Sequence, residues 1–171
     1  MKKLTLVILT LLILTGTVYY FFPEKKLPIN KKIDKLVVVK GTRTMDAYSN
    51  GQIIKTYKIS LGRAPIGDKE FEGDKRTPEG QYRINDKNPT SGYHKNLGIS
   101  YPNKRDIEEA DKKKLKPGGE IKIHGIRNGL GFIGKFQRMF DWTAGCIALT
   151  DEEVDELYYT VEIGTPIIIL P

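Results

Sequence analysis

An uncharged apolar run near the N-terminus constrains this chain more than any other feature. The run covers 19 residues, from Leu4 to Phe22, and it follows Lys2 and Lys3. A helix needs about 20 apolar residues to cross the hydrocarbon core of a bilayer, so the run has the length of a transmembrane helix. Basic residues ahead of such a run favour a cytoplasmic N-terminus. The sequence therefore predicts that the rest of the chain is exported.

Two kinds of N-terminal segment fit this run, a retained signal anchor and a cleaved signal peptide. Only Thr15-Gly16-Thr17 approaches a small-x-small cleavage site, and the aromatic residues 19–22 are typical of a membrane interface. We therefore expect residues 1–22 to be an anchor in membrane lipid and residues 23–35 to be a linker. Residues 36–171 then form a domain in the cell envelope, on the periplasmic side of the membrane.

The positive charge of the chain lies mostly ahead of that domain. The net charge is +7, and residues 1–40 hold eight Lys against one Glu and one Asp, which leaves +1 for the remainder. A nucleic-acid binder carries its basic excess on the folded module that meets the phosphates. We therefore expect no nucleic-acid partner.

Cysteine and histidine are scarce. One Cys and two His cannot make an internal disulfide or fill a four-ligand structural zinc site. An open zinc centre of His94, His124 and Cys146 satisfies the ligand count alone, without the short ligand spacing of metal motifs. We expect neither a metal nor a cofactor.

The domain has the sequence pattern of a mostly β fold. Asn50-Gly51 lies between two β-prone runs and predicts a tight hairpin, because both residues tolerate positive φ. The strands are predicted at residues 36–39, 44–48, 52–59, 80–84, 121–124 and 166–170. Two short helices are also predicted, at 106–115 with Asp106 as the N-cap and at 150–159 with Thr150 and Glu153 in capping-box spacing. We expect a mixed sheet or β-sandwich with short helices.

The only Cys, Cys146, is the candidate nucleophile. It precedes the second predicted helix, whose N-terminal N–H groups would stabilise a thiolate. Gly145 permits the close backbone approach that an oxyanion pocket requires. His124, at a strand end, could take the thiol proton and return it to a leaving amine. A buried, unreactive Cys is the alternative interpretation.

These residues resemble the L,D-transpeptidases of bacterial cell-wall synthesis, which carry a YkuD-type catalytic domain. The family signature is a His, a spacer, and a Ser or Thr followed by one residue and Gly-Cys. Here it reads His124-Gly125 and Thr143-Ala144-Gly145-Cys146. Residues 60–67 and 73–82, with their Gly-rich and Thr-Pro-x-Gly patterns, also resemble the family, and the resemblance covers about residues 36–171.

The resemblance implies an activity and a role for four residues. Cys146 would be the nucleophile, His124 the general base, and the Gly125 carbonyl the group that holds the imidazole tautomer. N–H groups around Gly145 would hold the oxyanion. The family opens an amide of a peptidoglycan stem peptide, releases D-Ala, and passes the acyl group from a thioester to an amine, without a metal.

Two positions depart from the commonest family pattern. Ala144 stands where many members carry His, and Ala148 stands where many carry Arg or Asn. Together with the motifs at residues 93–94, 99–103 and 141–143, they resemble the YafK-type branch. That branch includes a hydrolase that cuts the link between peptidoglycan and an attached lipoprotein, so water remains an alternative acyl acceptor. A non-catalytic wall-binding domain is the third possibility.

Five further residues are candidates for substrate binding: Thr143, Trp142, Arg138, His94 and Tyr101. Arg138 precedes Cys146, and a guanidinium binds carboxylates of the stem bidentately; Arg63 and Arg127 are weaker candidates of the same kind. Trp142 could form a pocket wall, and the Thr143 hydroxyl could fix the turn before the thiol. Solvated or core positions remain the alternative for Arg138, His94 and Trp142.

Overall fold

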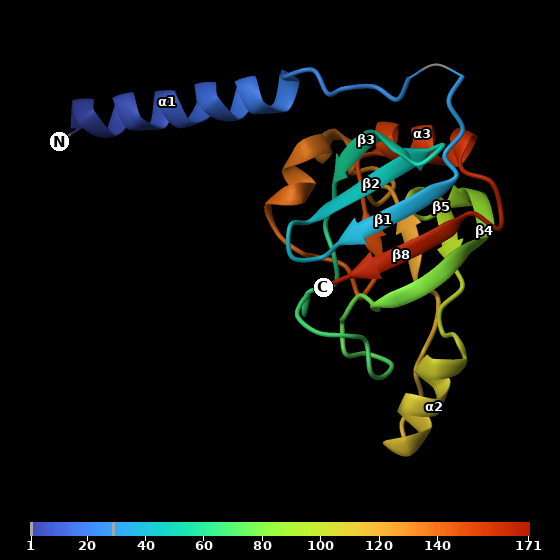
Figure 1. Ribbon diagram of the computed structural model, residues 1–171. Coiled ribbons are helices and arrows are strands. Elements are labelled where there is room, and N and C mark those ends of the chain that lie inside the picture. The colour runs from blue at the N-terminus through green and yellow to red at the C-terminus, as the bar shows by residue number, and fades with distance from the viewer. Residues whose placement is uncertain (1, 29) are drawn as a thin grey trace.

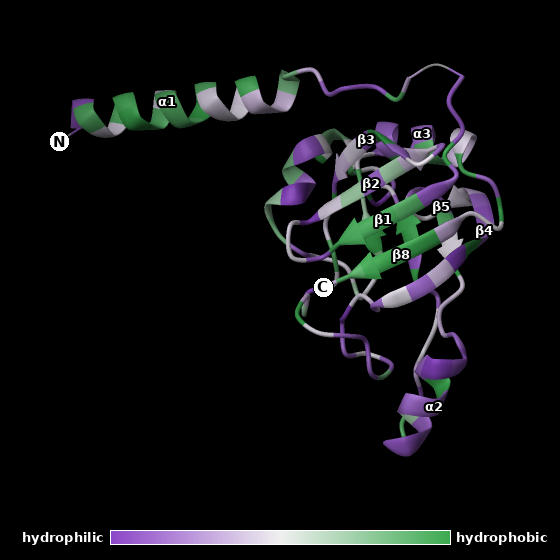
Figure 2. Cartoon of the chain, in the orientation of Figure 1, coloured by the Kyte–Doolittle hydropathy of each residue, from purple (hydrophilic) through white to green (hydrophobic). Residues whose placement is uncertain are grey.

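The computed structural model describes residues 2–28 and 30–171, in which one long helix precedes a curled β-sheet (Figure 1). Met1 and Ile29, which belong to the expected anchor and linker, lie outside the described residues. Helix α1 (Lys2–Phe21) has no buried residue and is apolar over most of its length (Figure 2). Among the described residues it is the one helix long and apolar enough to cross a membrane.

Eight strands form one mixed sheet in the order β3-β2-β1-β8-β4-β5-β6-β7. Neighbouring strands are antiparallel except for the β1/β8 and β6/β7 pairs, so the predicted mixed sheet is confirmed. The strands are β1 (Lys35–Val39), β2 (Thr44–Ser49), β3 (Gln52–Lys58), β4 (Gly80–Ser91), β5 (His94–Ile99), β6 (Lys122–His124), β7 (Ile147–Ala148) and β8 (Pro166–Leu170).

The β2/β3 hairpin turns where the sequence predicts it. Asn50 and Gly51 have φ values of 51° and 75°, which suit the tight turns that match strand twist. Along β1, burial alternates with a period of two, and Leu36 and Val38 are fully buried. The core therefore lies on the inner face of the sheet.

The sheet curls back on itself. Strand β4 pairs with β8 through residues 80–83 and with β5 through residues 84–91, and its register shifts near Ile84. Just after β3, Ser60 exchanges both backbone hydrogen bonds with Ala148 of β7, at 2.9 and 2.8 Å. The two ends of the strand order are thus brought together, and β7 lies between β6 and the segment that follows β3.

Both predicted helices are present and begin at capping residues, but the cap of the first differs from the prediction. Helix α2 (Lys104–Lys112) is capped by Asn103, and Asp106 is instead the third helical residue, whose carboxylate accepts the Asn103 N–H. Asn103 takes the cap position because its extended backbone lets its own side chain accept the Asp106 N–H. Helix α3 (Asp151–Thr160) begins after Thr150 with the expected capping box to Glu153.

The sequence patterns did not predict β5, β7 or the 3₁₀ segment η1 (Gly131–Met139). Strand β7 has only two residues, and β5 is short and largely polar at its start. Segment η1 consists of two turns separated by Gly134, whose φ of 50° and ψ of −127° are not helical. Such short elements depend on their tertiary partners rather than on their own periodicity.

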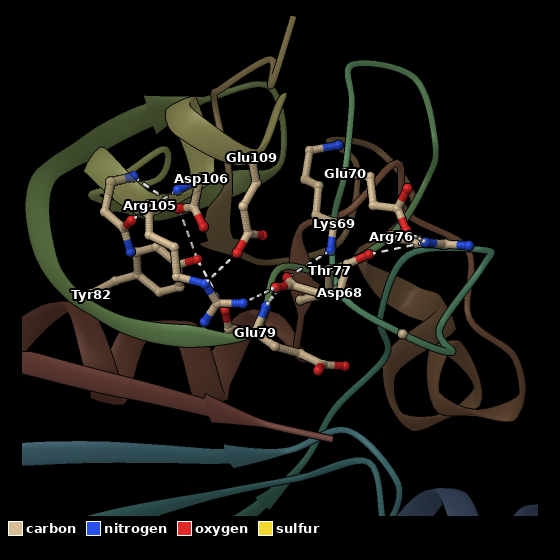
Figure 3. A network of polar contacts seen from close by, with 12 residues as sticks. Asp68, Lys69, Glu70, Arg76, Thr77, Glu79, Tyr82, Arg105, Asp106 and Glu109 are labelled. Carbon is tan, nitrogen blue, oxygen red and sulfur yellow. Dashed lines mark hydrogen bonds and ion pairs between the residues drawn. The ribbon is translucent and has the colours of Figure 1, made fainter. Parts of the chain in front are cut away.

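The connection between β3 and β4, residues 59–79, is held in place by buried charges. Lys40 is buried and its ammonium donates to the carbonyls of Gly67 and Thr77 and to the Glu79 carboxylate, at 2.6 to 2.8 Å. Figure 3 shows the continuation of this network, in which Asp68 accepts the Glu79 N–H and faces Arg105. The β3–β4 connection is therefore fixed in place and can support the segments that pack against it.

Candidate active site

His124 and Cys146 are brought together by two adjacent parallel strands. In the β6/β7 register Ile123 lies opposite Ile147 and His124 opposite Ala148. Cys146 comes directly before β7, beside Lys122 of β6. Since side chains alternate along a strand, His124, Lys122 and Cys146 share one face of the sheet.

That face opens into a cavity of about 480 Å³. Its lining comes from five separate parts of the chain, namely the β3–β4 connection, the β4–β5 hairpin, β6, Glu120 ahead of β6, and the turn before β7. The lining residues are Arg63, Lys75, Ser91, Tyr93, Asn96, Glu120, Lys122, His124, Trp142, Thr143, Ala144 and Cys146.

The His124 imidazole is buried and held in one orientation. Only 5% of the residue is exposed, and its ring lies 4.8 Å from that of Tyr93 and 5.6 Å from that of Trp142. Nδ1 is 2.7 Å from the Gly125 carbonyl, which can only accept, so Nδ1 carries the proton and Nε2 is a free acceptor. Burial lowers the pKa of His124, and the Lys122 charge adds to this effect against the opposing Gly125 hydrogen bond.

The Cys146 sulfur is a thiol at rest. Burial raises the pKa of Cys146 above its ordinary value, and the backbone N–H and charge of Lys122 oppose this only in part. Sγ lies 3.5 Å from the Glu120 carbonyl, to which a thiol can donate. The thiolate expected from the nearby helix N-terminus is therefore not favoured, because burial outweighs the N–H and charge of Lys122.

The turn before Cys146 is fixed by Thr143. Its buried hydroxyl accepts the Gly145 N–H at 3.1 Å and donates to the Cys146 carbonyl at 2.7 Å. Gly145 has a φ of 132°, and a Cβ on it would lie 2.7 Å from the Arg76 carbonyl of the β3–β4 connection. Only glycine fits there, and its N–H is already used by Thr143.

Gly125 is required for a similar steric reason. A Cβ on this residue would lie 2.6 Å from Oδ1 of Asp151 and 2.9 Å from Cβ of His94. The Gly125 N–H donates to the Tyr93 carbonyl at 3.1 Å, which ties the end of β6 to the β4–β5 hairpin. The carbonyl that orients His124 is therefore itself held firmly.

Trp142 and Thr143 line the cavity, but Arg138, His94 and Tyr101 do not. Arg138 is buried and pairs with Glu153 and Glu24, each at 2.8 Å. Although burial alone would lower it, these carboxylates raise the pKa of Arg138 above its ordinary value. The Arg138 guanidinium is thus paired with carboxylates inside the protein and does not face the cavity.

The other two candidates also have partners elsewhere. Nε2 of His94 lies 2.7 Å from Asp155 of α3, and the Tyr101 hydroxyl donates to the Pro117 carbonyl at 2.9 Å. Nε2 of His94 is thus engaged by Asp155 and not directed to the cavity. Across residues 2–28 and 30–171, no three His, Cys, Asp or Glu side chains gather as a metal site.

The sequence patterns missed several residues of the cavity. Lys122 could have been found, since it lies two residues before His124 on the same strand face. Lys75 and Asn96 could not, because they reach the cavity from distant segments. Asn96 lies opposite His124 in the β5/β6 register, and its buried Oδ1 has no hydrogen-bond partner among the described residues.

Comparison with known proteins gives one family. A family model for the YkuD L,D-transpeptidase catalytic domain matches residues 34–169. The Escherichia coli K12 protein named "Putative L,D-transpeptidase YafK" is 28% identical over 130 residues, which is 72% of this chain and 45% of that protein. The chain spans about half the length of the curated relatives it matches.

Solved structures resemble the chain over most of its length. The helical cell shape determining protein Pgp2 from Campylobacter jejuni is 25% identical with a TM-score of 0.60, over 82% of this chain and 48% of that one. Bd1075 of Bdellovibrio bacteriovorus is 22% identical with a TM-score of 0.57, over 82% and 48%. An L,D-transpeptidase from Mycobacterium smegmatis is 15% identical with a TM-score of 0.54, over 82% and 59%. The last two likenesses show the fold alone.

Proposed function

The chain belongs to the L,D-transpeptidase family with a YkuD-type catalytic domain, whose members modify peptidoglycan, and from this premise we propose that it is a cysteine acyltransferase acting on stem peptides. The observation that carries the proposal is the pairing of Cys146 and His124 on one cavity face, with Nδ1 of His124 tied to the Gly125 carbonyl. This leaves Nε2 as the base.

The first half-reaction begins from a neutral Cys146 thiol and a neutral His124 imidazole. Nε2 of His124 takes the proton of the Cys146 thiol as the sulfur attacks a stem-peptide carbonyl. A C–S bond forms, the oxyanion collapses, and the C–N bond breaks. His124 then gives its proton to the departing amine of D-Ala, which leaves a thioester. Because the Gly145 N–H is held by Thr143, other N–H groups of the turn hold the oxyanion.

The second half-reaction reverses these proton transfers. His124 takes a proton from an incoming amine, the amine attacks the thioester, and the new amide forms as the Cys146 thiol is restored. The same thioester could be resolved by water, which would make the protein a hydrolase. The likeness to YafK and the small Ala144 at the cavity are compatible with hydrolysis, and a product assay distinguishes it from transfer.

The charges around the cavity suit an acidic substrate. Arg63, Lys75 and Lys122 line it against a single acidic residue, Glu120. Peptidoglycan stems present carboxylates that guanidinium and ammonium groups bind. The unpartnered Oδ1 of Asn96 is an acceptor for an amide N–H of the bound stem.

Helix α1 supports a place for this activity outside the cytoplasm. With Lys2 and Lys3 at its start, the helix would span the membrane as an anchor and leave residues 34–169 facing the wall. The likeness to Pgp2 extends the proposal to wall remodelling that affects cell shape.

A carbapenem tests the thiol, because its strained amide carbonyl acylates a reactive sulfur. The full chain in detergent is incubated with the compound and weighed intact, beside Cys146→Ala and His124→Gln. We expect one adduct on the wild type, none on Cys146→Ala, and slow formation on His124→Gln. No adduct on folded wild-type protein would overturn the proposal.

Muropeptide analysis then identifies the acyl acceptor. Joined muropeptides indicate transfer to an amine, and shortened or released peptides indicate hydrolysis. Binding to sacculi with no change in the muropeptides, on protein whose thiol does not react, would indicate a wall-binding domain instead.

A further inference from the structure

Segment η1 is fixed to the outer end of α1. The Tyr20 hydroxyl donates to the Phe132 carbonyl at 2.8 Å, and the rings of Tyr19 and Tyr20 lie 5.9 and 5.5 Å from that of Phe136. In Figure 1, residues 131–139, drawn in orange, are the part of the domain beside α1, whereas α2 lies at the far end. The η1 segment is therefore placed at the level of the aromatic end of α1.

Part of η1 reaches further along α1, toward its N-terminus. Phe136 and Met139 share a groove with Leu12, Ile13 and Gly16 of α1. A Cβ on Gly16 would lie 3.8 Å from the Phe136 ring. Gly16 is four residues before Tyr20, about 6 Å along the helix at a rise of ~1.5 Å per residue, so the Phe136 ring packs against α1 over the turn between Gly16 and Tyr20. In a bilayer spanned by α1, that depth is the boundary of headgroups and acyl chains.

The exposed surface of η1 matches this position. Phe132 and Met139 are each 73% exposed and Phe140 is 66% exposed, so three large apolar side chains lie uncovered on one short segment. The Lys135 ammonium, by contrast, is directed to the Phe22 carbonyl and to Glu24, which follow α1. Phe136 and Met139 thus lie beside the middle of α1 while the cation lies at its outer end, as for side chains that snorkel at an interface.

We propose that η1, with the adjoining Phe140, is a membrane-docking element, and that the apolar side chains Phe132, Phe136, Met139 and Phe140 enter the outer surface of the lipid bilayer beside α1. The proposal rests on the anchor in the proposed function but not on the thiol chemistry. Docking fixes the domain on the membrane through two attachments, η1 and the linker from α1, rather than through the linker alone.

The docked segment lies next to the candidate active site. A second cavity of about 300 Å³ is lined by Leu130, Ile133 and Phe140 from around η1 and by Tyr93 and Trp142, which also line the first cavity. The Cys146 cavity is therefore held at a constant height above the lipid, and the stems it meets are those close to the membrane surface.

Quenching of tryptophan fluorescence by lipids brominated on the acyl chain tests the docking. The full chain is reconstituted into phosphatidylcholine vesicles as Met139→Trp, as Phe132→Trp and as Ile163→Trp, with wild type giving the Trp142 background. Ile163 is a matched control, because it is 65% exposed and belongs to the α3–β8 connection. Figure 1 shows that connection on the opposite side of the sheet from η1. We expect most of the added fluorescence to be lost for Met139→Trp and Phe132→Trp and little for Ile163→Trp.

Each other outcome overturns a different step. Equal, weak quenching in all three variants, with the chain still resistant to alkaline extraction, overturns docking and leaves the anchor. Release by alkali overturns the anchor and docking together. Quenching that varies with the protein-to-lipid ratio would mean that a second copy of the chain covers η1. Carbapenem labelling of Cys146 is read separately, so loss of the thiol chemistry leaves the docking result intact.

Discussion

The hydroxyl of Thr143 is expected to hold the turn that presents Cys146. It makes two hydrogen bonds of 3.1 and 2.7 Å, to the Gly145 N–H and the Cys146 carbonyl. In Thr143→Val the shape is kept, but both backbone groups lose their partner. A buried polar group left unsatisfied costs ~1–3 kcal/mol, so the loss of both partners should lower the unfolding free energy by about 2–6 kcal/mol. For a chain of this size, at about 3 °C per kcal/mol, that lowers Tm by about 6–18 °C.

Thr143→Ser is the matched control, because it keeps the hydroxyl and loses one methyl group. Burial of that methyl contributes about 1 kcal/mol, or about 3 °C in Tm. Thermal unfolding followed by circular dichroism gives the two values. The carbapenem acylation rate, measured below both transitions, should fall at least tenfold in Thr143→Val and change little in Thr143→Ser, since Gly145 and Cys146 no longer share a fixed turn.

The reasoning is refuted if Thr143→Val melts within about 2 °C of Thr143→Ser, which corresponds to less than ~1 kcal/mol. It is refuted equally if Thr143→Val reacts with the carbapenem as fast as wild type. Either result would mean that the support from Arg76, against which Gly145 packs, is sufficient to position the thiol.

Two further predictions concern the charges around the site. The pKa of His124 is lowered from its ordinary 6.5, so its imidazole stays neutral as the pH falls through 6.5. The carbapenem acylation rate should therefore begin to fall only below that pH. A midpoint of the rate–pH profile at or above 6.5 would contradict the burial argument. Arg138→Met leaves the buried Glu153 without its 2.8 Å partner and should lose about 3–5 kcal/mol in urea unfolding, yet it should form the carbapenem adduct normally when folded, because Arg138 lies outside the cavity.

The local elements of the fold could be predicted from the sequence because their signals are local. Asn50-Gly51 determines a turn, and Thr150 with Glu153 caps α3, through contacts within a few residues. The closure of the sheet could not be predicted, because it depends on Ser60 meeting Ala148, 88 positions along the chain. The β7 strand has no pattern of its own and exists only because β6 and the segment after β3 lie on either side of it.

The candidate site could likewise be predicted only in part from the sequence. The spacing of His124, Gly145 and Cys146 is visible in the sequence, but the burial that sets their protonation is not. The helix-terminus argument predicts a thiolate at Cys146, whereas desolvation raises its pKa and lowers that of His124. Sequence proximity to α3 was misleading because the residues between them form β7, which directs the thiol toward β6.

The difference in protonation changes what the fold has to supply. A preformed thiolate needs only a substrate carbonyl, whereas a neutral pair needs an imidazole whose free nitrogen is aimed at the sulfur when the carbonyl arrives. The chain holds the imidazole with rigid parts: the Gly125 carbonyl fixes the ring at Nδ1, and Tyr93 and Trp142 enclose it. Both aromatic residues also border the cavity next to η1, so the surface that orients the base is continuous with the segment proposed to rest on the membrane. A change in the position of η1 would therefore reach Tyr93 and Trp142, in the wall of the candidate active site, before it reached Cys146.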